Sequence, residues 1–210
     1  PDPDQIETGT TTKAAAGIEP FSRVSVRHRG LSATIELRAS ASAGDKHQAS
    51  LLVASTAQEV ESVLRELPSV RPGVFVLRLQ PHERETPSGG NDEQRRLYSS
   101  TYYRTALAWQ VQDILTALAY LTERAGFHQV QLAGLGEAGI PALLARALVP
   151  TGKVSLTIAD LAGLDGQDEK TWTGARTQPG ILRCGGLKTA ALLAAPGGLV
   201  LHNTGAHLDS

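Results

Sequence analysis

A short glycine-rich turn between an apolar strand and an apolar helix is the segment of this sequence best suited to chemistry. Residues 130–140 read VQLAGLGEAGI. In one kind of chemistry, the pattern G-x-S-x-G holds a nucleophilic serine on a strained strand-to-helix bend at the top of a sheet. On this pattern Gly134 takes the first glycine and Ala138 the second, which leaves Gly136 at the position of the serine. Glycine has no side chain, so it cannot be acylated.

The same turn also fits a second chemistry, the binding of a dinucleotide. The fingerprint G-x-G-x-x-G is matched by Gly134, Gly136 and Gly139, and its glycines let a pyrophosphate approach the backbone. An acidic residue about 20 positions further on holds the ribose in such sites, and Asp160 stands at about that distance. The alternative prediction is therefore a Rossmann-like domain that binds NAD(P) through these four residues.

The elements before the turn favour the first chemistry. Two β-prone runs at 21–28 and 31–39 predict an antiparallel hairpin, and further strands are expected at 51–55 and 74–80. A dinucleotide fingerprint normally lies at the first strand-to-helix turn of its sheet. Here several strands precede it, which is the order expected of a hydrolase scaffold.

Strands and helices alternate through the rest of the sequence. Thr56 and Glu59 form the signature of a capping box before a helix over 60–67. Apolar spacing predicts helices at about 101–124, 140–148 and 187–195, and strands at 129–133, 154–159 and 199–203. The predicted fold class is therefore α/β: an α/β-hydrolase-like, mostly parallel sheet of about seven strands, with an N-terminal antiparallel hairpin and helices on both faces.

The length and composition indicate one globular domain. Residues 1–20 lack apolar periodicity and are expected to form a linker or extended arm, and residues 21–210 a single domain without an eighth strand. A net charge of −1 indicates no nucleic-acid partner, and no apolar run approaches the roughly 20 residues that span a membrane. The localisation is left open: the first residue is not Met, which is compatible with a processed secreted or periplasmic protein.

The other groups that acyl transfer requires have only weak candidates. Hydrolases of this fold place the catalytic acid after the seventh strand, where His207 and Asp209 lie, and the histidine after an eighth. Glu137 reads either as a carboxylate of a residual pocket or as a solvated acid favoured by the helix dipole. Cys184 is the single cysteine, and the six histidines show no metal-ligand spacing. We therefore expect neither a metal nor a cofactor.

Several segments resemble the bacterial acetyl-xylan-esterase-like α/β-hydrolases. The resemblance covers about residues 50–205 and is carried by YYRT at 102–105, DILTALAYL at 113–121 and GLGEAG at 134–139, with weaker matches in GILR at 180–183 and LLAAP at 192–196. It implies deacetylation of carbohydrate esters through an acyl-serine.

Because Gly136 stands where that serine is required, the sequence predicts a catalytically degenerate member with a structural, binding or partner role. The partner expected is another protein domain or subunit, or a carbohydrate ligand. The NAD(P)-binding domain is the first alternative, and an active carbohydrate esterase with atypical residues is the second.

Overall fold

One eight-stranded sheet organises the chain. The computed structural model describes residues 6–10, 21–28, 31–40, 47–56, 58, 59, 62, 73–79, 104–150 and 152–204. The strands are β1 (Ile6–Thr10), β2 (Phe21–His28), β3 (Leu31–Ser40), β4 (Gln48–Ala54), β5 (Val74–Arg78), β6 (Gln129–Gly134), β7 (Val154–Asp160) and β8 (Gly198–His202). Their order in space is β1-β2-β3-β5-β4-β6-β7-β8.

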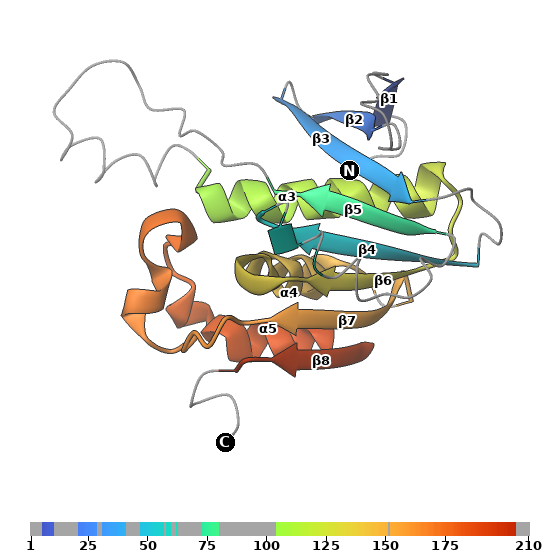
Figure 1. The fold of residues 1–210 in the computed structure, drawn as a ribbon. Helices are drawn as coiled ribbons and strands as arrows, with labels where there is room; N and C mark the ends of the chain where they lie inside the picture. The colour runs from blue at the N-terminus through green and yellow to red at the C-terminus, as the bar shows by residue number, and fades with distance from the viewer. Residues whose placement is uncertain are drawn as a thin grey trace, which may run out of the picture.

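The sheet is antiparallel at its N-terminal end and parallel in its larger part. β1, β2, β3 and β5 pair antiparallel in succession, whereas β5, β4, β6, β7 and β8 all run the same way, as their arrowheads show in Figure 1. The mostly parallel sheet and its N-terminal hairpin are confirmed. One strand more than predicted is present, because residues 6–10 of the segment expected to be a linker or arm form β1.

Three α-helices lie behind the parallel strands in Figure 1. They are α3 (Ala106–Ala119), α4 (Gly139–Leu148) and α5 (Gly186–Ala194). α3 begins later than the predicted 101, because the Thr105 side chain caps it by accepting a hydrogen bond from the Ala108 N–H at 3.1 Å. The last turn of the predicted helix is the π-helical segment η2 (Tyr120–Arg124).

The main core lies between these helices and the sheet. Leu51 and Val53 of β4 point into it and are fully buried, together with Leu132 of β6. Side chains alternate along a strand, so Leu52 and Ala54 belong to a smaller cluster on the other face, where Ala133 packs against them.

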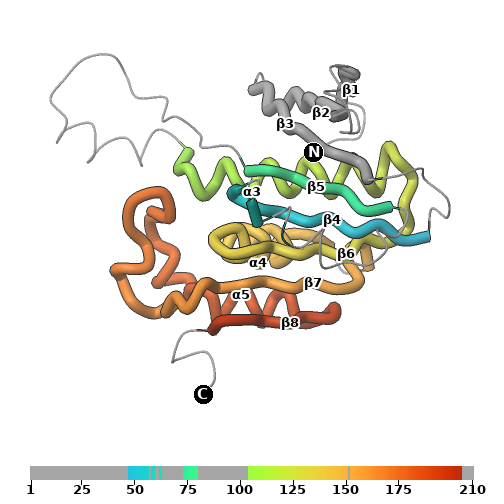
Figure 2. The backbone as a smooth tube through the Cα atoms, viewed as in Figure 1, coloured from blue at the N-terminus to red at the C-terminus, as the bar shows by residue number. Residues whose placement is uncertain are grey.

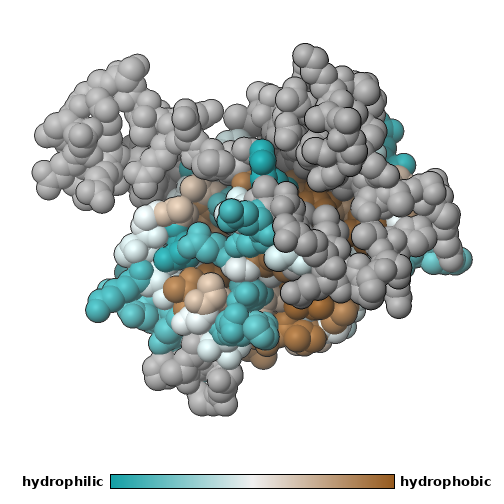
Figure 3. Space-filling model, in the orientation of Figure 1, coloured by the Kyte–Doolittle hydropathy of each residue, from teal (hydrophilic) through white to brown (hydrophobic). Residues whose placement is uncertain are grey.

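Along that other face, burial declines toward the β8 edge. The register aligns Leu52, Ala133, Ile158 and Val200 across four neighbouring strands. Leu52 is buried, but Ile158 is 40% exposed and Val200 49% exposed. Figure 3 shows apolar surface low on this face, over β7 and β8.

The segment between β7 and α5 is an excursion at the carboxyl edge of the parallel strands (Figure 2). It contains the short 3-10 helices η4 (Glu169–Trp172), η5 (Gly174–Arg176) and η6 (Leu182–Cys184). Trp172 is buried, and its indole N–H donates to the Gly166 carbonyl at 3.0 Å. The excursion is therefore packed into the domain beside the strand ends, where α/β folds place their sites.

Candidate site at the strand-to-helix bend

The predicted turn is a sharp bend at the carboxyl end of β6, between β4 and β7. Leu135 is still extended, with φ −100° and ψ 133°, and Gly136 then takes φ +51°. A short 3-10 turn, η3 (Gly136–Ala138), leads directly into α4. Any residue other than glycine at position 136 would have to adopt the left-handed backbone conformation. Such a strained backbone is expected of the exposed residue at a nucleophile elbow.

The two flanking glycines are explained by packing. A Cβ on Gly134 would lie 2.6 Å from the Ala142 Cβ and 2.7 Å from the Ala138 carbonyl oxygen. A Cβ on Gly139 would fall on the backbone carbonyl oxygen of Asp160 in β7. Both glycines therefore let α4 approach the sheet closely. A dinucleotide is not needed to account for either of them.

Above the bend lies the carboxylate of Glu59, which sequence reasoning treated only as a helix cap. A Cβ on Gly136 would be 2.6 Å from Glu59 Oε1. Glu59 Oε2 accepts hydrogen bonds from the backbone N–H groups of Ser55, at 3.1 Å, and Thr56, at 3.0 Å. The Thr56 hydroxyl accepts in turn from the Glu59 N–H at 3.3 Å, so the predicted capping box is confirmed.

The position of these N–H donors has a chemical meaning. In serine hydrolases of this architecture, an N–H from the loop after the corresponding strand helps to form the oxyanion hole. Here the loop after β4 directs its Ser55 and Thr56 N–H groups to Glu59. The two loop donors that could stabilise an oxyanion therefore already bind an internal carboxylate.

Glu59 also argues against a dinucleotide at the bend. A pyrophosphate seated at Gly136 would meet the Glu59 carboxylate, and two negative groups at such close range repel each other. Asp160, the predicted ribose ligand, accepts instead from the Ala162 N–H at 2.8 Å and from the Asn203 side-chain amide at 2.9 Å. The nucleotide-binding alternative is not favoured.

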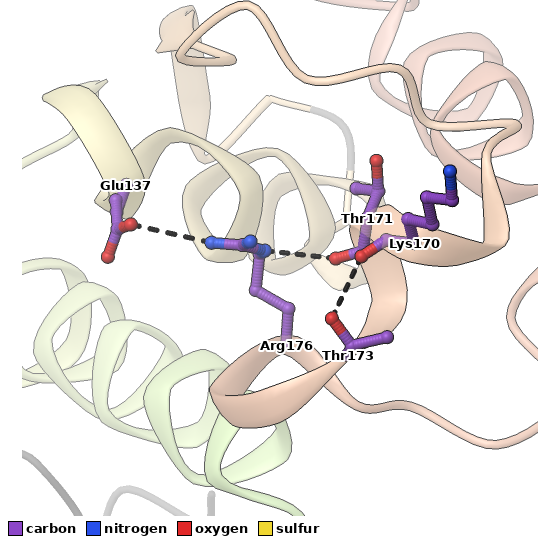
Figure 4. Close-up of polar contacts among 5 residues, drawn as sticks. All are labelled: Glu137, Lys170, Thr171, Thr173 and Arg176. Atoms are coloured by element: carbon purple, nitrogen blue, oxygen red, sulfur yellow. Dashed lines mark hydrogen bonds and ion pairs between the residues drawn. The ribbon is translucent and has the colours of Figure 1, made fainter.

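Glu137, the second residue of η3, is directed toward Arg176 of the excursion (Figure 4). Its side chain is 70% exposed and pairs at 3.4 Å with Nη1 of Arg176. Figure 4 shows how Arg176 is held: its Nε donates to the Thr171 carbonyl at 2.9 Å. In the same close-up the Thr173 hydroxyl donates to the Lys170 carbonyl at 2.9 Å. The arrangement ties the excursion to the start of α4 through a solvated ion pair.

Of the remaining predicted candidates, the structure describes only Cys184. Cys184 is exposed in η6 and lines a groove between the helices. His207 and Asp209 lie outside the described residues. Within the described part of the chain, no group of three or more His, Cys, Asp or Glu side chains could hold a metal ion. No described helix is long and apolar enough to cross a membrane.

The signal that could have placed Glu59 was present in the sequence. Thr56 and Glu59 follow a buried strand directly, and the glycine-rich turn follows another. Carboxyl ends of parallel strands meet at one edge of a sheet. What the sequence did not give is the adjacency of β4 and β6, which brings the two strand ends together.

The class of fold emerges from comparison with solved structures. The chain is similar to the catalytic domain of a glucuronoyl esterase from Hypocrea jecorina, with 14% identity and a TM-score of 0.53 over 94% of this chain and 60% of that one. It is also similar to a glucuronoyl esterase from Sporotrichum thermophile, with 14% identity and a TM-score of 0.54 over 95% and 59%.

These similarities show that the chain has an α/β-hydrolase fold of the kind found in esterases. The chain spans about three fifths of the length of these two structures. No protein-family model matches the sequence, and a comparison with curated proteins finds no match.

Proposed function

We propose that this chain is a catalytically degenerate α/β-hydrolase domain, similar to the acetyl-xylan-esterase-like enzymes, that serves by binding a ligand or partner. The observation that carries the proposal is the pair formed by Gly136 and Glu59. The nucleophile position bears no attacking atom, and a carboxylate that binds two backbone donors lies over it.

The energetic consequence of this pair is large. In serine hydrolases, removal of the nucleophile or its base lowers kcat by about a million-fold, and part of the residual rate depends on the oxyanion hole. In this chain Gly136 occupies the position of the nucleophile, and the Ser55 and Thr56 N–H groups already bind Glu59. Hydrolysis at this bend therefore lacks an attacking atom, and the loop after β4 offers neither its Ser55 nor its Thr56 N–H group to an oxyanion.

Ester hydrolysis by the purified chain is the direct test. We expect no release of p-nitrophenol from p-nitrophenyl acetate above the rate with heat-denatured chain. The variants Glu137→Ala, His207→Ala and Cys184→Ser should leave this background rate unchanged. Turnover that any one of these substitutions abolishes would refute the degenerate function and support an active esterase with atypical residues.

Binding of a carbohydrate ester is the second part of the test. One of the similar solved structures, a Sporotrichum thermophile glucuronoyl esterase variant, holds methyl 4-O-methyl-β-D-glucopyranuronate. We expect this glucuronate ester to bind the chain without being hydrolysed. Calorimetric titration measures the binding, and chromatography of the recovered ligand shows whether the ester is intact. Loss of the methyl ester would contradict the proposal, and absence of heat would restrict the role to protein partners.

A further inference from the structure

An apolar groove runs between the three helices, away from the bend. Its volume is about 440 Å³, within the range of small-molecule sites, which run from about 300 to 1,000 Å³. Its lining comes from α3, α4, α5 and the end of the excursion, and none of residues 134–139 takes part. Its apolar wall includes Ala108 of α3, Leu148 of α4 and Leu193 of α5.

The leucines at the rim of this groove are unusually open to solvent. Leu148 at the end of α4 is 65% exposed, and Leu193 on α5 is 56% exposed. The next residue along, Leu192, is 72% exposed. Contiguous exposed apolar surface on a folded domain is typical of a binding site.

Charge at the groove has one sign. Among the described residues that line it, Arg104 is the only charged side chain, and its guanidinium lies 5.1 Å from the centre of the Trp109 ring. Arg183 and Lys188 are exposed and adjoin the lining residues Cys184 and Thr189. A second copy of this chain would bring like charges together, whereas an anionic ligand would be attracted.

We infer that the groove binds a monoanionic amphiphile, such as a medium-chain carboxylate. The apolar chain lies along α3, α4 and α5, and the carboxylate lies at Arg104. An apolar surface gives the affinity, and a cation at one end fixes the orientation of the ligand. The site is independent of the bend, so it does not depend on the function proposed there.

The single cysteine provides the readout, because Cys184 lies on the wall of the groove and is exposed. The experiment measures the rate at which N-ethylmaleimide alkylates Cys184 in the full chain, with decanoate, decyltrimethylammonium or 1-decanol present below its aggregation concentration. Decanoate at ten times its Kd should slow alkylation about tenfold. The cationic amphiphile should protect at least fivefold less well at the same concentration.

Two variants distinguish specific binding in the groove from nonspecific adsorption of amphiphiles to an apolar surface. Arg104→Gln should raise the Kd for decanoate about fivefold and leave the Kd for 1-decanol unchanged. Ala108→Trp should fill the groove and abolish protection by both, with far-ultraviolet circular dichroism verifying that it folds. Equal protection by the cationic amphiphile, unchanged decanoate binding in Arg104→Gln, or no protection at all would each overturn the inference.

Discussion

Serine at position 136 is the substitution that most sharply tests how the bend is built. Gly136 has φ +51°, and a side chain in the left-handed region costs about 1–2 kcal/mol. A Cβ there would also lie 2.6 Å from Glu59 Oε1, so the carboxylate must move. Moving it breaks the hydrogen bonds from Ser55 and Thr56, at about 1 kcal/mol each. Gly136→Ser should therefore lower the free energy of unfolding by about 3–4 kcal/mol.

A matched control separates the two contributions. Gly163 has φ +70°, and a Cβ on it would have no neighbour within 4 Å. Gly163→Ser should therefore show the conformational cost alone, about 1–2 kcal/mol. Urea unfolding followed by circular dichroism gives both values.

A double-mutant cycle then tests the role of Glu59 itself. In a Glu59→Ala background the obstructing carboxylate is gone, so Gly136→Ser should cost only about 1–2 kcal/mol. The coupling between the two sites should thus be about 2 kcal/mol. If the losses of the two single variants add up to that of the double variant within about 0.5 kcal/mol, the two sites are independent. That result would refute the contact between Glu59 and a side chain at position 136.

Five further substitutions, in three comparisons, test the packing and the ion pair around α4 by urea unfolding. Gly139→Ala should lower the free energy of unfolding by at least about 3 kcal/mol, because its Cβ would meet the backbone of β7. Gly174→Ala, with open space around it, should lower it by no more than about 2 kcal/mol. Equal losses in the two variants would contradict the packing argument. Arg146 is buried; its Nη1 donates to the Val149 carbonyl at 3.1 Å, but its Nε and Nη2 have no hydrogen-bond partner in the described part of the chain. Arg146→Met should therefore change stability by less than about 1 kcal/mol or raise it, and a loss above 2 kcal/mol would show that the guanidinium is needed. Glu137→Ala should lower the free energy of unfolding by less than about 0.5 kcal/mol, because it removes half of a solvated ion pair. Arg176→Ala should lower it by about 1 kcal/mol more, because the variant also loses the hydrogen bond to the Thr171 carbonyl. A larger loss in Glu137→Ala than in Arg176→Ala would contradict these roles.

The fold followed from the sequence wherever apolar periodicity was strong. The strands at 129–133 and 154–159 and the helix at 140–148 were predicted within one residue of their observed ends. In β6 and α4 the side chains alternate between core and surface with the period of the element, which is the property that a sequence displays directly. The start of α3 was predicted too early, because Thr105 is a capping residue inside an otherwise helical composition.

The candidate site was predicted only in part. Spacing located the bend, whereas the assignment of Gly136 to a nucleophile position stays a prediction and Glu59 was predicted solely as a helix cap. Glu59 has two roles in the structure: its carboxylate closes the capping box, and it also lies over the bend. The second role depends on β4 and β6 being neighbours, and adjacency of strands is a tertiary property that no local pattern encodes.

The capping box beside Gly136 also determines what a serine at this position would require of its surroundings. A single codon change to serine would create a hydroxyl, but the new side chain would press against Glu59 and lower stability at once. Removing Glu59 first would free the two N–H donors, yet it gives no advantage while the bend carries no hydroxyl. A hydroxyl at position 136 with free N–H donors beside it thus requires two substitutions, because neither substitution alone supplies both groups.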